Sequence, residues 1–64
     1  KDFNLLSSAS SDSSIINKVQ AGTPVDVLQV WDSHDGRRWL LVDVLSQNYY
    51  QLFYKRGWVD IGTS

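Results

Sequence analysis

The sequence contains no cysteine, no methionine and no glutamate, and it has a single proline. Without cysteine the chain can form neither a disulfide framework nor a zinc–thiolate site, and it has no cysteine nucleophile. Alanine occurs only at positions 9 and 21, so two of the best helix formers are absent or scarce. These absences exclude a disulfide-rich scaffold and indicate little helix.

Targeting and nucleic-acid signals are also missing. No apolar run approaches the roughly 20 residues that a membrane span needs, and no signal-peptide pattern is present. The formal net charge is −1, and basic residues gather only as the pairs Arg37-Arg38 and Lys55-Arg56. Because a nucleic-acid reader needs a basic stripe for phosphates, nucleic acid is disfavoured as a partner.

What the chain does have is an abundance of large apolar side chains. Its 64 residues include three Trp, three Tyr and two Phe, besides many Val, Ile and Leu. A chain this short buries only about 60% of its unfolded surface, so its core must be dense, and few residues remain for an active site. We expect one domain over residues 1–64. Since the chain begins with lysine and lacks methionine, we expect it to be one module of a longer protein.

The apolar residues follow the period of a strand better than that of a helix. Alternation is clean at residues 25–27 and again where Leu40, Val42 and Val44 share one face. Between these stretches the apolar parity changes at Leu28, which predicts a β-bulge or a change of packed face. The pattern predicts strands at residues 3–6, 15–19, 25–31, 39–45, 49–56 and 58–61.

Small and polar residues mark the connections. The serine-rich tract at residues 7–14 predicts an ordered surface loop, because its side chains compete for backbone hydrogen bonds; a disordered linker is the alternative. Gly22 and Pro24 predict a turn, and Asp35-Gly36 predicts a tight hairpin. Residues 46–48 predict a second polar break. Five to six short antiparallel strands joined by tight turns describe a small all-β barrel.

Several short motifs follow one another along the chain. They are Asn4-Leu5, the serine-rich loop, Ile15-Ile16, Val19-Gln20-Ala21-Gly22-Thr23-Pro24-Val25-Asp26-Val27-Leu28, Trp39 before an alternating strand, and Arg56-Gly57-Trp58-Val59. Together they resemble the bacterial SH3 (SH3b) domain family, whose pattern includes Lys-Gly-Thr-x-Val-x-Val-Leu and a closing Gly-Trp-Val. The resemblance covers nearly the whole chain and implies an SH3-like barrel.

The resemblance also implies a function. Family members similar to this chain are non-catalytic accessory modules, often attached to cell-wall hydrolases or other exported proteins, which bind wall peptide or glycan or pack against a neighbouring domain. This implies a cell-envelope or extracellular location, whereas the lack of cysteine favours no compartment. The chain departs from the family at three places: Leu6 stands where the family has Arg, Ser8-Ala9 replace Gly-Pro, and residues 46–55 look longer than the usual hairpin.

The three tryptophans are the first candidate binding residues. Most large aromatic residues of a small barrel belong to its core, so each also has a purely structural interpretation. If the Leu40 face is the inner one, however, Trp39 points away from the core, and the same argument turns Trp58 outward. Exposed aromatic rings offer a stacking platform for sugars or a slot for an extended peptide. We therefore expect Trp31, Trp39 and Trp58 to contact a ligand or partner.

The aromatic segment near the C-terminus is the second candidate. Tyr49 and Phe53 share one strand parity, and Tyr50 and Tyr54 share the other. A lone hairpin cannot bury both pairs, so one pair covers a second small core or contacts a partner. We expect Tyr50 and Tyr54 to be partly exposed and to extend the binding surface.

Catalytic and metal-binding patterns are weak. Asp32, His34 and Asp35 fall in a short segment that ends in Gly36, which is typical of a turn, and the chain lacks the glutamate of a calcium loop. A Ser-His-Asp triad needs a histidine held by a buried carboxylate in a pocket, not one in a turn. We expect no enzyme activity, metal site or cofactor.

The charged residues are expected at the surface. The two basic pairs either form one small basic patch or act as solvated edge charges that discourage strand aggregation. Alternation places Asp26, Asp43 and Asp60 on the outer face of their strands, opposite these bases.

Two functions stay open at this point. The first is a binding or targeting module that recognises cell-wall peptide, glycan or a protein partner through exposed aromatic residues. It predicts that Trp39→Ala weakens binding without unfolding the domain. The second is a structural domain that packs against other domains or subunits of its own parent protein.

Overall fold

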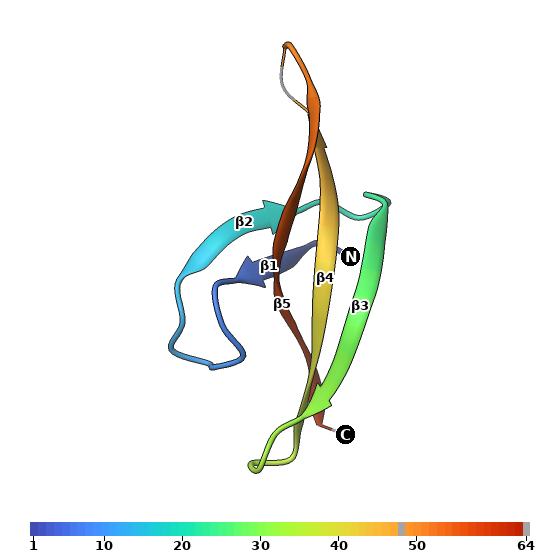
Figure 1. Ribbon diagram of the computed structural model, residues 1–64. Helices are drawn as coiled ribbons and strands as arrows, with labels where there is room; N and C mark the ends of the chain where they lie inside the picture. The colour runs from blue at the N-terminus through green and yellow to red at the C-terminus, as the bar shows by residue number, and fades with distance from the viewer. Residues whose placement is uncertain (48, 64) are drawn as a thin grey trace.

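A computed structural model describes residues 1–47 and 49–63 as a single antiparallel sheet (Figure 1). Its strands are β1 (Phe3–Leu6), β2 (Ile15–Val19), β3 (Val25–Asp32), β4 (Arg37–Gln47) and β5 (Leu52–Thr63). None of the described residues lies in a helix, in keeping with the missing glutamate and scarce alanine. The predicted all-β class is confirmed.

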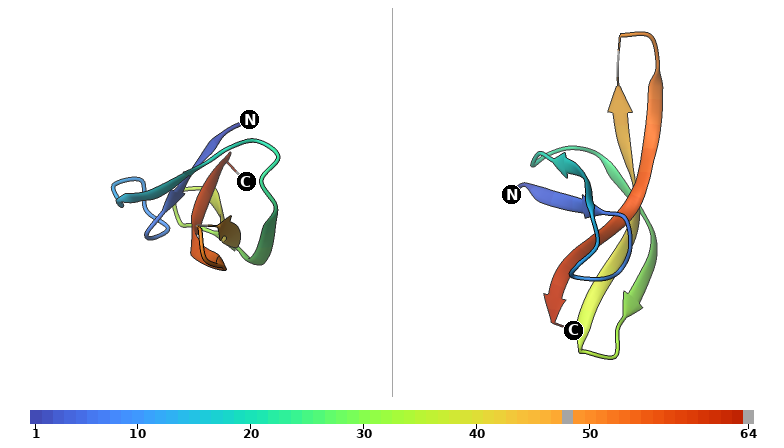
Figure 2. Two further views of the ribbon diagram at one scale, coloured as in Figure 1. Left: turned by 90° about the horizontal axis from the view of Figure 1, so that it is seen from above. Right: turned by 90° about the vertical axis from the view of Figure 1, so that its left-hand side faces the viewer.

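The strands follow the order β2-β1-β5-β4-β3 across the sheet. The sheet curls around, as Figure 2 shows from above, but its outermost strands β2 and β3 do not pair with each other. The architecture is therefore barrel-like with an unclosed sheet. The molecule is elongated, with extents of 41 × 20 × 19 Å, because the β4–β5 hairpin extends well beyond the other strands (Figure 1).

The strands at this hairpin are longer than the sequence pattern predicts. β4 has 11 residues and β5 has 12. The predicted break at residues 46–48 is wrong for Ser46 and Gln47, which continue β4 opposite Phe53 and Leu52, while Asn48 lies outside the described residues. The predicted strand at residues 49–56 begins only at Leu52, and it continues through residues 58–61 as one strand, because Gly57 pairs with Val42 within the ladder.

The predicted turns and bulge are confirmed. Gly36 has a φ of 82° in the β3–β4 hairpin, and Gly22 has a φ of 88° in the turn before Pro24. The register of β3 against β4 shifts between Val27 and Gln29, where the apolar parity changes. The serine-rich loop is ordered by its own hydrogen bonds, which include a 2.9 Å bond from the Ser7 N–H to the Ser14 carbonyl.

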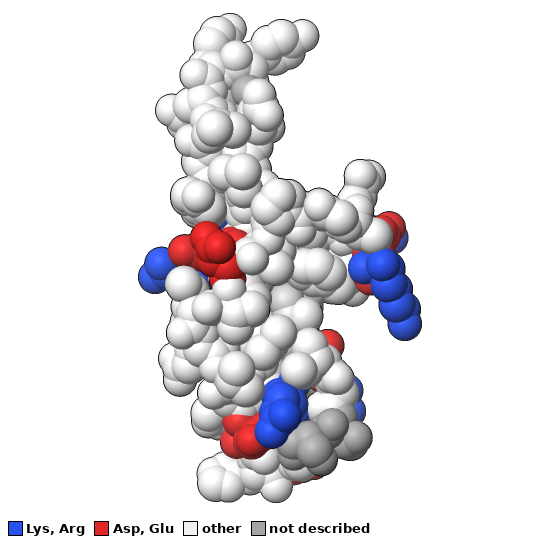
Figure 3. Space-filling view, turned by 90° about the vertical axis from the view of Figure 1, so that its right-hand side faces the viewer, with Lys and Arg blue, Asp and Glu red and all other residues white. Residues whose placement is uncertain are grey.

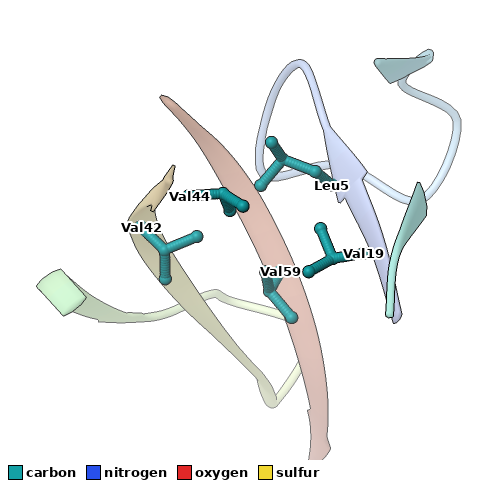
Figure 4. Packing of buried hydrophobic residues seen from close by; sticks show 5 residues of the cluster. All are labelled: Leu5, Val19, Val42, Val44 and Val59. Carbon is teal, nitrogen blue, oxygen red and sulfur yellow. The ribbon is translucent and has the colours of Figure 1, made fainter. Parts of the chain in front are cut away.

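A small aliphatic cluster forms the core between the β1–β2 hairpin and the β4–β5 ladder (Figure 4). Val42 and Val44 point into it from β4, as the alternation predicts, with Leu40 packed at its margin. The fully or nearly buried members are Leu5, Val19, Val42, Val44 and Val59. Phe3 packs against this cluster from its margin, and Trp39 is buried apart from it.

Glycine is required at position 57 for steric reasons. A Cβ at this position would lie 2.6 Å from Leu5 Cγ and 2.9 Å from the Leu6 carbonyl oxygen. Leu5 is completely buried, and Leu6 pairs with Trp58, so β1 crosses β5 at the residue without a side chain. Gly57 thus lets the β1–β2 hairpin approach the core.

We expect Gly57→Ala to lower the free energy of unfolding by about 2 kcal/mol, because the added methyl group collides with backbone as well as with Leu5. Urea unfolding followed by circular dichroism measures the change. Ser46→Ala, in the same hairpin, serves as the control and should cost less than about 0.5 kcal/mol. Equal stability of Gly57→Ala and the parent would contradict the proposed crossing.

Candidate partner-binding surface

Trp39 is not part of an exposed surface. Its side chain is only 2% exposed, although it shares the strand parity of Leu41 and Asp43 and does not belong to the aliphatic cluster. Trp31 lies directly opposite it on β3, and Asp60 lies opposite it on β5. Alternation assigns Trp39 to the correct face, but its side chain is buried there. The prediction that Trp39 points into a binding groove is therefore wrong. Because the indole is buried, we expect Trp39→Ala to lower the free energy of unfolding or to unfold the domain.

Trp31 and Trp58 form an accessible pair on this same face. Their rings meet edge to face, with centroids 6.3 Å apart and planes inclined by 67°. Trp31 is 38% exposed, and Trp58 is half-buried. Such a geometry is favourable for aromatic rings, and it holds both indoles in place. Two of the three predicted tryptophans therefore lie together at the surface.

A shallow groove runs along this pair. It has a volume of about 270 Å³, and its lining residues are Ala9, Gln29, Trp31 and Trp58. The strand register explains two of them, because Gln29 on β3, Leu41 on β4 and Trp58 on β5 form one row across the sheet. Ala9 is contributed by the serine-rich loop. We name these four residues the tryptophan groove.

The tryptophan groove combines aromatic faces with neutral polar groups. None of the described residues that line it is charged, and the amide of Gln29 can both donate and accept hydrogen bonds. A surface of this kind suits a ligand with apolar faces and neutral polar edges, such as a sugar ring or an extended peptide. Sequence alternation alone could not identify Gln29 and Ala9, since the bulge and the fold of the serine-rich loop bring them to the tryptophans.

The tyrosines of the β4–β5 hairpin are exposed, as predicted for two of them. Tyr50 is 95% exposed and Tyr54 is 60% exposed, which confirms their predicted accessibility. Tyr49, at 99%, is exposed as well, and the Tyr49 and Tyr50 rings lie 6.2 Å apart in the connection between the strands, not within a strand. None of these residues lines the tryptophan groove.

His34 lies in the β3–β4 turn, as predicted. The turn is held by the Ser33 hydroxyl, which donates to Asp35 and to the Arg37 carbonyl, and by the Gly36 N–H, which donates to the Ser33 carbonyl at 3.1 Å. These contacts explain the presence of Ser33 and Asp35 by their role in forming the turn, without a catalytic role. Within residues 1–47 and 49–63, no three potential ligand side chains gather closely enough to hold a metal ion.

The arginines are bound to aspartates of neighbouring strands. The shortest N–O distances are 2.7 Å for Arg37–Asp60, 2.7 Å for Arg38–Asp32 and 2.9 Å for Arg56–Asp43. The expectation that Asp26, Asp43 and Asp60 face the basic residues is confirmed for Asp43 and Asp60, whereas Asp26 forms no ion pair with a described residue. Charges of both signs therefore adjoin one another on the surface, as Figure 3 shows for the face over β3.

These contacts shift the pKa values of the carboxyl groups. The hydrogen bond from Arg56 lowers the pKa of Asp43, and that from Arg38 lowers the pKa of Asp32. Partial desolvation acts to raise the pKa of Asp60, but hydrogen bonds from Arg37 and the Gly62 N–H outweigh it and leave the pKa below its usual value. Each of these groups is thus held in its charged form.

Comparison of the chain with protein-family models, with curated proteins and with solved structures finds no match. In the described part of the chain, there is also no helix of the length and apolar character that would cross a membrane.

The domain should lose stability in acid. A carboxyl group with a lowered pKa in the folded state stabilises the fold above its unfolded pKa, and this stabilisation is lost as pH falls through the folded pKa. For Asp32, Asp43 and Asp60 the loss begins near the ordinary value of 3.8 and continues below it. The urea midpoint should therefore fall between about pH 5 and about pH 2.5. Asp43→Asn should flatten this dependence, and a midpoint independent of pH would contradict the ion pairs.

The three tryptophans should differ in their access to solvent. In single-tryptophan variants with the other two replaced by Phe, acrylamide should quench Trp31 at least about threefold more efficiently than Trp39, because Trp39 is buried. Trp58 should lie between them. Circular dichroism confirms that each variant is folded. Efficient quenching of Trp39 in a folded variant would show that its face is open.

Proposed function

We propose that the chain is a non-catalytic binding module of the SH3b type, which recognises cell-wall peptide or glycan, or a protein partner, through the tryptophan groove. One observation carries this proposal: the partly exposed edge-to-face pair of Trp31 and Trp58 beside the serine-rich loop. The exposed tyrosines, Tyr50 and Tyr54, offer a second contact area to a large ligand.

The energetics of exposure support a binding role. Leaving apolar surface in water costs about 25 cal/mol per Å², and clustered exposed aromatic residues commonly mark interaction sites. Trp and Tyr dominate binding hot spots, since they bury large areas with little loss of conformational entropy. The Trp31–Trp58 pair has this character, and its rings are already oriented against each other.

The motif that carries the family resemblance also supports the proposal. In Gly57-Trp58-Val59, alternation sends Val59 into the aliphatic core and leaves Trp58 in the tryptophan groove. Gly57 meanwhile accommodates Leu5. The same short segment therefore serves the fold and presents an indole to a ligand.

A non-catalytic role agrees with the position of the single histidine. His34 is exposed in a turn whose aspartate and serine side chains are occupied by turn hydrogen bonds. General acid–base catalysis needs such a group held in a pocket near a nucleophile.

The alternative function is a structural domain that packs against other domains or subunits of its parent protein. It is favoured by the apolar side chains of β3, since Val27 is 53% exposed, Leu28 is 46% exposed and Val30 is 55% exposed. An interface with a neighbouring domain would cover them.

Trp31→Ala should reduce retention of the isolated domain on insoluble peptidoglycan about tenfold or more, with little change in the melting temperature, because Trp31 is partly exposed and buried only on binding. Val30→Ala is the matched control, since Val30 is the adjacent, exposed β3 residue and has the opposite parity. It should bind like the parent domain.

Two outcomes would count against the proposal. Failure of the parent domain to bind peptidoglycan would remove the cell-wall ligand and favour the structural alternative. Equal loss of binding in the Trp31 and Val30 variants would show that the tryptophan groove is not the site.

A further inference from the structure

The outer edge of β3 lacks most of the features that protect edge strands. β3 is the last strand of the sheet, spans eight residues, and contains no Lys, Arg or Pro. Natural edge strands are usually short, charged with Lys, or interrupted by Pro, because their free N–H and C=O groups can pair with another strand. Here only two aspartates and the bulge after Val27 interrupt the edge.

Beside this edge the core face of the sheet is open. Val25 and Val27 lie in register with the buried Val44 and Val42, yet they are 38% and 53% exposed. They form one wall of an apolar cleft of about 560 Å³. Phe3 of β1 and Ile61 of β5 line other parts of the cleft, and Lys1, Asp2 and Asp60 also border it. The core face therefore continues, uncovered, to the free edge.

The opposite face carries an incomplete row of charges. Arg56, Asp43 and Asp26 lie in register on β5, β4 and β3. Arg56 binds Asp43 through two hydrogen bonds, of 2.9 and 3.2 Å, and no described cation forms an ion pair with Asp26. The row thus holds two carboxylates and one guanidinium. The carboxylates of Asp26 and Asp43 lie directly opposite each other, which is unfavourable for like charges. A cation on the outer side of Asp26 would balance it.

We propose that the outer edge of β3 binds an extended peptide segment as an added strand, with the side-chain pattern apolar-basic-apolar. Side chains directly opposite one another share a face. The two apolar residues, opposite Val25 and Val27, would enter the cleft, and the basic residue, opposite Asp26, would complete the charge row. Figure 3, which views the molecule from the β3 side, shows a largely uncharged surface interrupted by acidic groups with basic groups beside them.

Charge argues against a second copy of β3 as the occupant. The only charged residues of β3 are Asp26 and Asp32, so pairing two β3 strands across a two-fold axis would bring acidic edges together. A basic segment of a partner meets no such repulsion. This site is distinct from the tryptophan groove, because the two share no lining residue.

The test uses two capped peptides, acetyl-Thr-Val-Arg-Val-Thr-amide and its counterpart with Asp in place of Arg, titrated into the ¹⁵N-labelled domain. The Arg peptide should shift the amide signals of residues 25–28 and leave the indole signals of Trp31 and Trp58 in place. Asp26→Lys should weaken the Arg peptide about tenfold and strengthen the Asp peptide. Asp12→Lys, the same charge change in the serine-rich loop, should leave both affinities unchanged.

Several results would overturn the proposal: no shift with the Arg peptide, equal affinity for the two peptides, shifts centred on the indoles, or concentration-dependent self-association that the peptide does not alter. Trp31→Ala separates the two sites. It should reduce peptidoglycan binding about tenfold or more and leave the Arg peptide bound, so either proposal can fail without the other.

Discussion

The close approach of Leu5 to Gly57 is the contact on which the other features of the domain depend. Gly57 pairs with Val42 inside the longest ladder of the sheet, so its missing side chain opens a space at the centre of the β4–β5 hairpin. β1 crosses at this point, and Leu5 enters the core. Only a few aliphatic residues are buried there, so we expect a chain of 64 residues to have a small free energy of unfolding.

The same crossing organises the two faces of the sheet. The residue after Gly57 lies on the opposite face, where Trp58 pairs with Leu6 in the ladder and meets Trp31 edge to face. The next residue, Val59, returns to the core. The three tryptophans lie outside the aliphatic cluster: Trp39 is buried apart from it, whereas Trp31 and Trp58 line the tryptophan groove.

Much of the fold could be predicted from local patterns in the sequence. Strand alternation identified the inner face of β4, the parity change at Leu28 located the bulge, and Asp35-Gly36 located the hairpin turn. These features succeed because each depends on neighbouring residues alone: the strand period, the count of residues at a bulge, and the positive φ of glycine.

The candidate site was harder to predict, because it depends on contacts between distant strands. Parity placed Trp39 on the outer face but could not reveal that the face is covered there. Gly57 resembled the end of a strand, although it is the point at which another strand crosses. Gln29 and Ala9 join the tryptophans only through the strand register and the fold of the serine-rich loop.

The separation of buried from ligand-accessible tryptophans is tested most directly by the three indole N–H signals in a ¹H–¹⁵N spectrum. Soluble peptidoglycan fragments should shift the signals of Trp31 and Trp58 and leave that of Trp39 unchanged, since only the first two line the tryptophan groove. Fragments that shift none of the three signals, or that shift Trp39 as strongly as Trp31, would contradict this assignment of the binding surface.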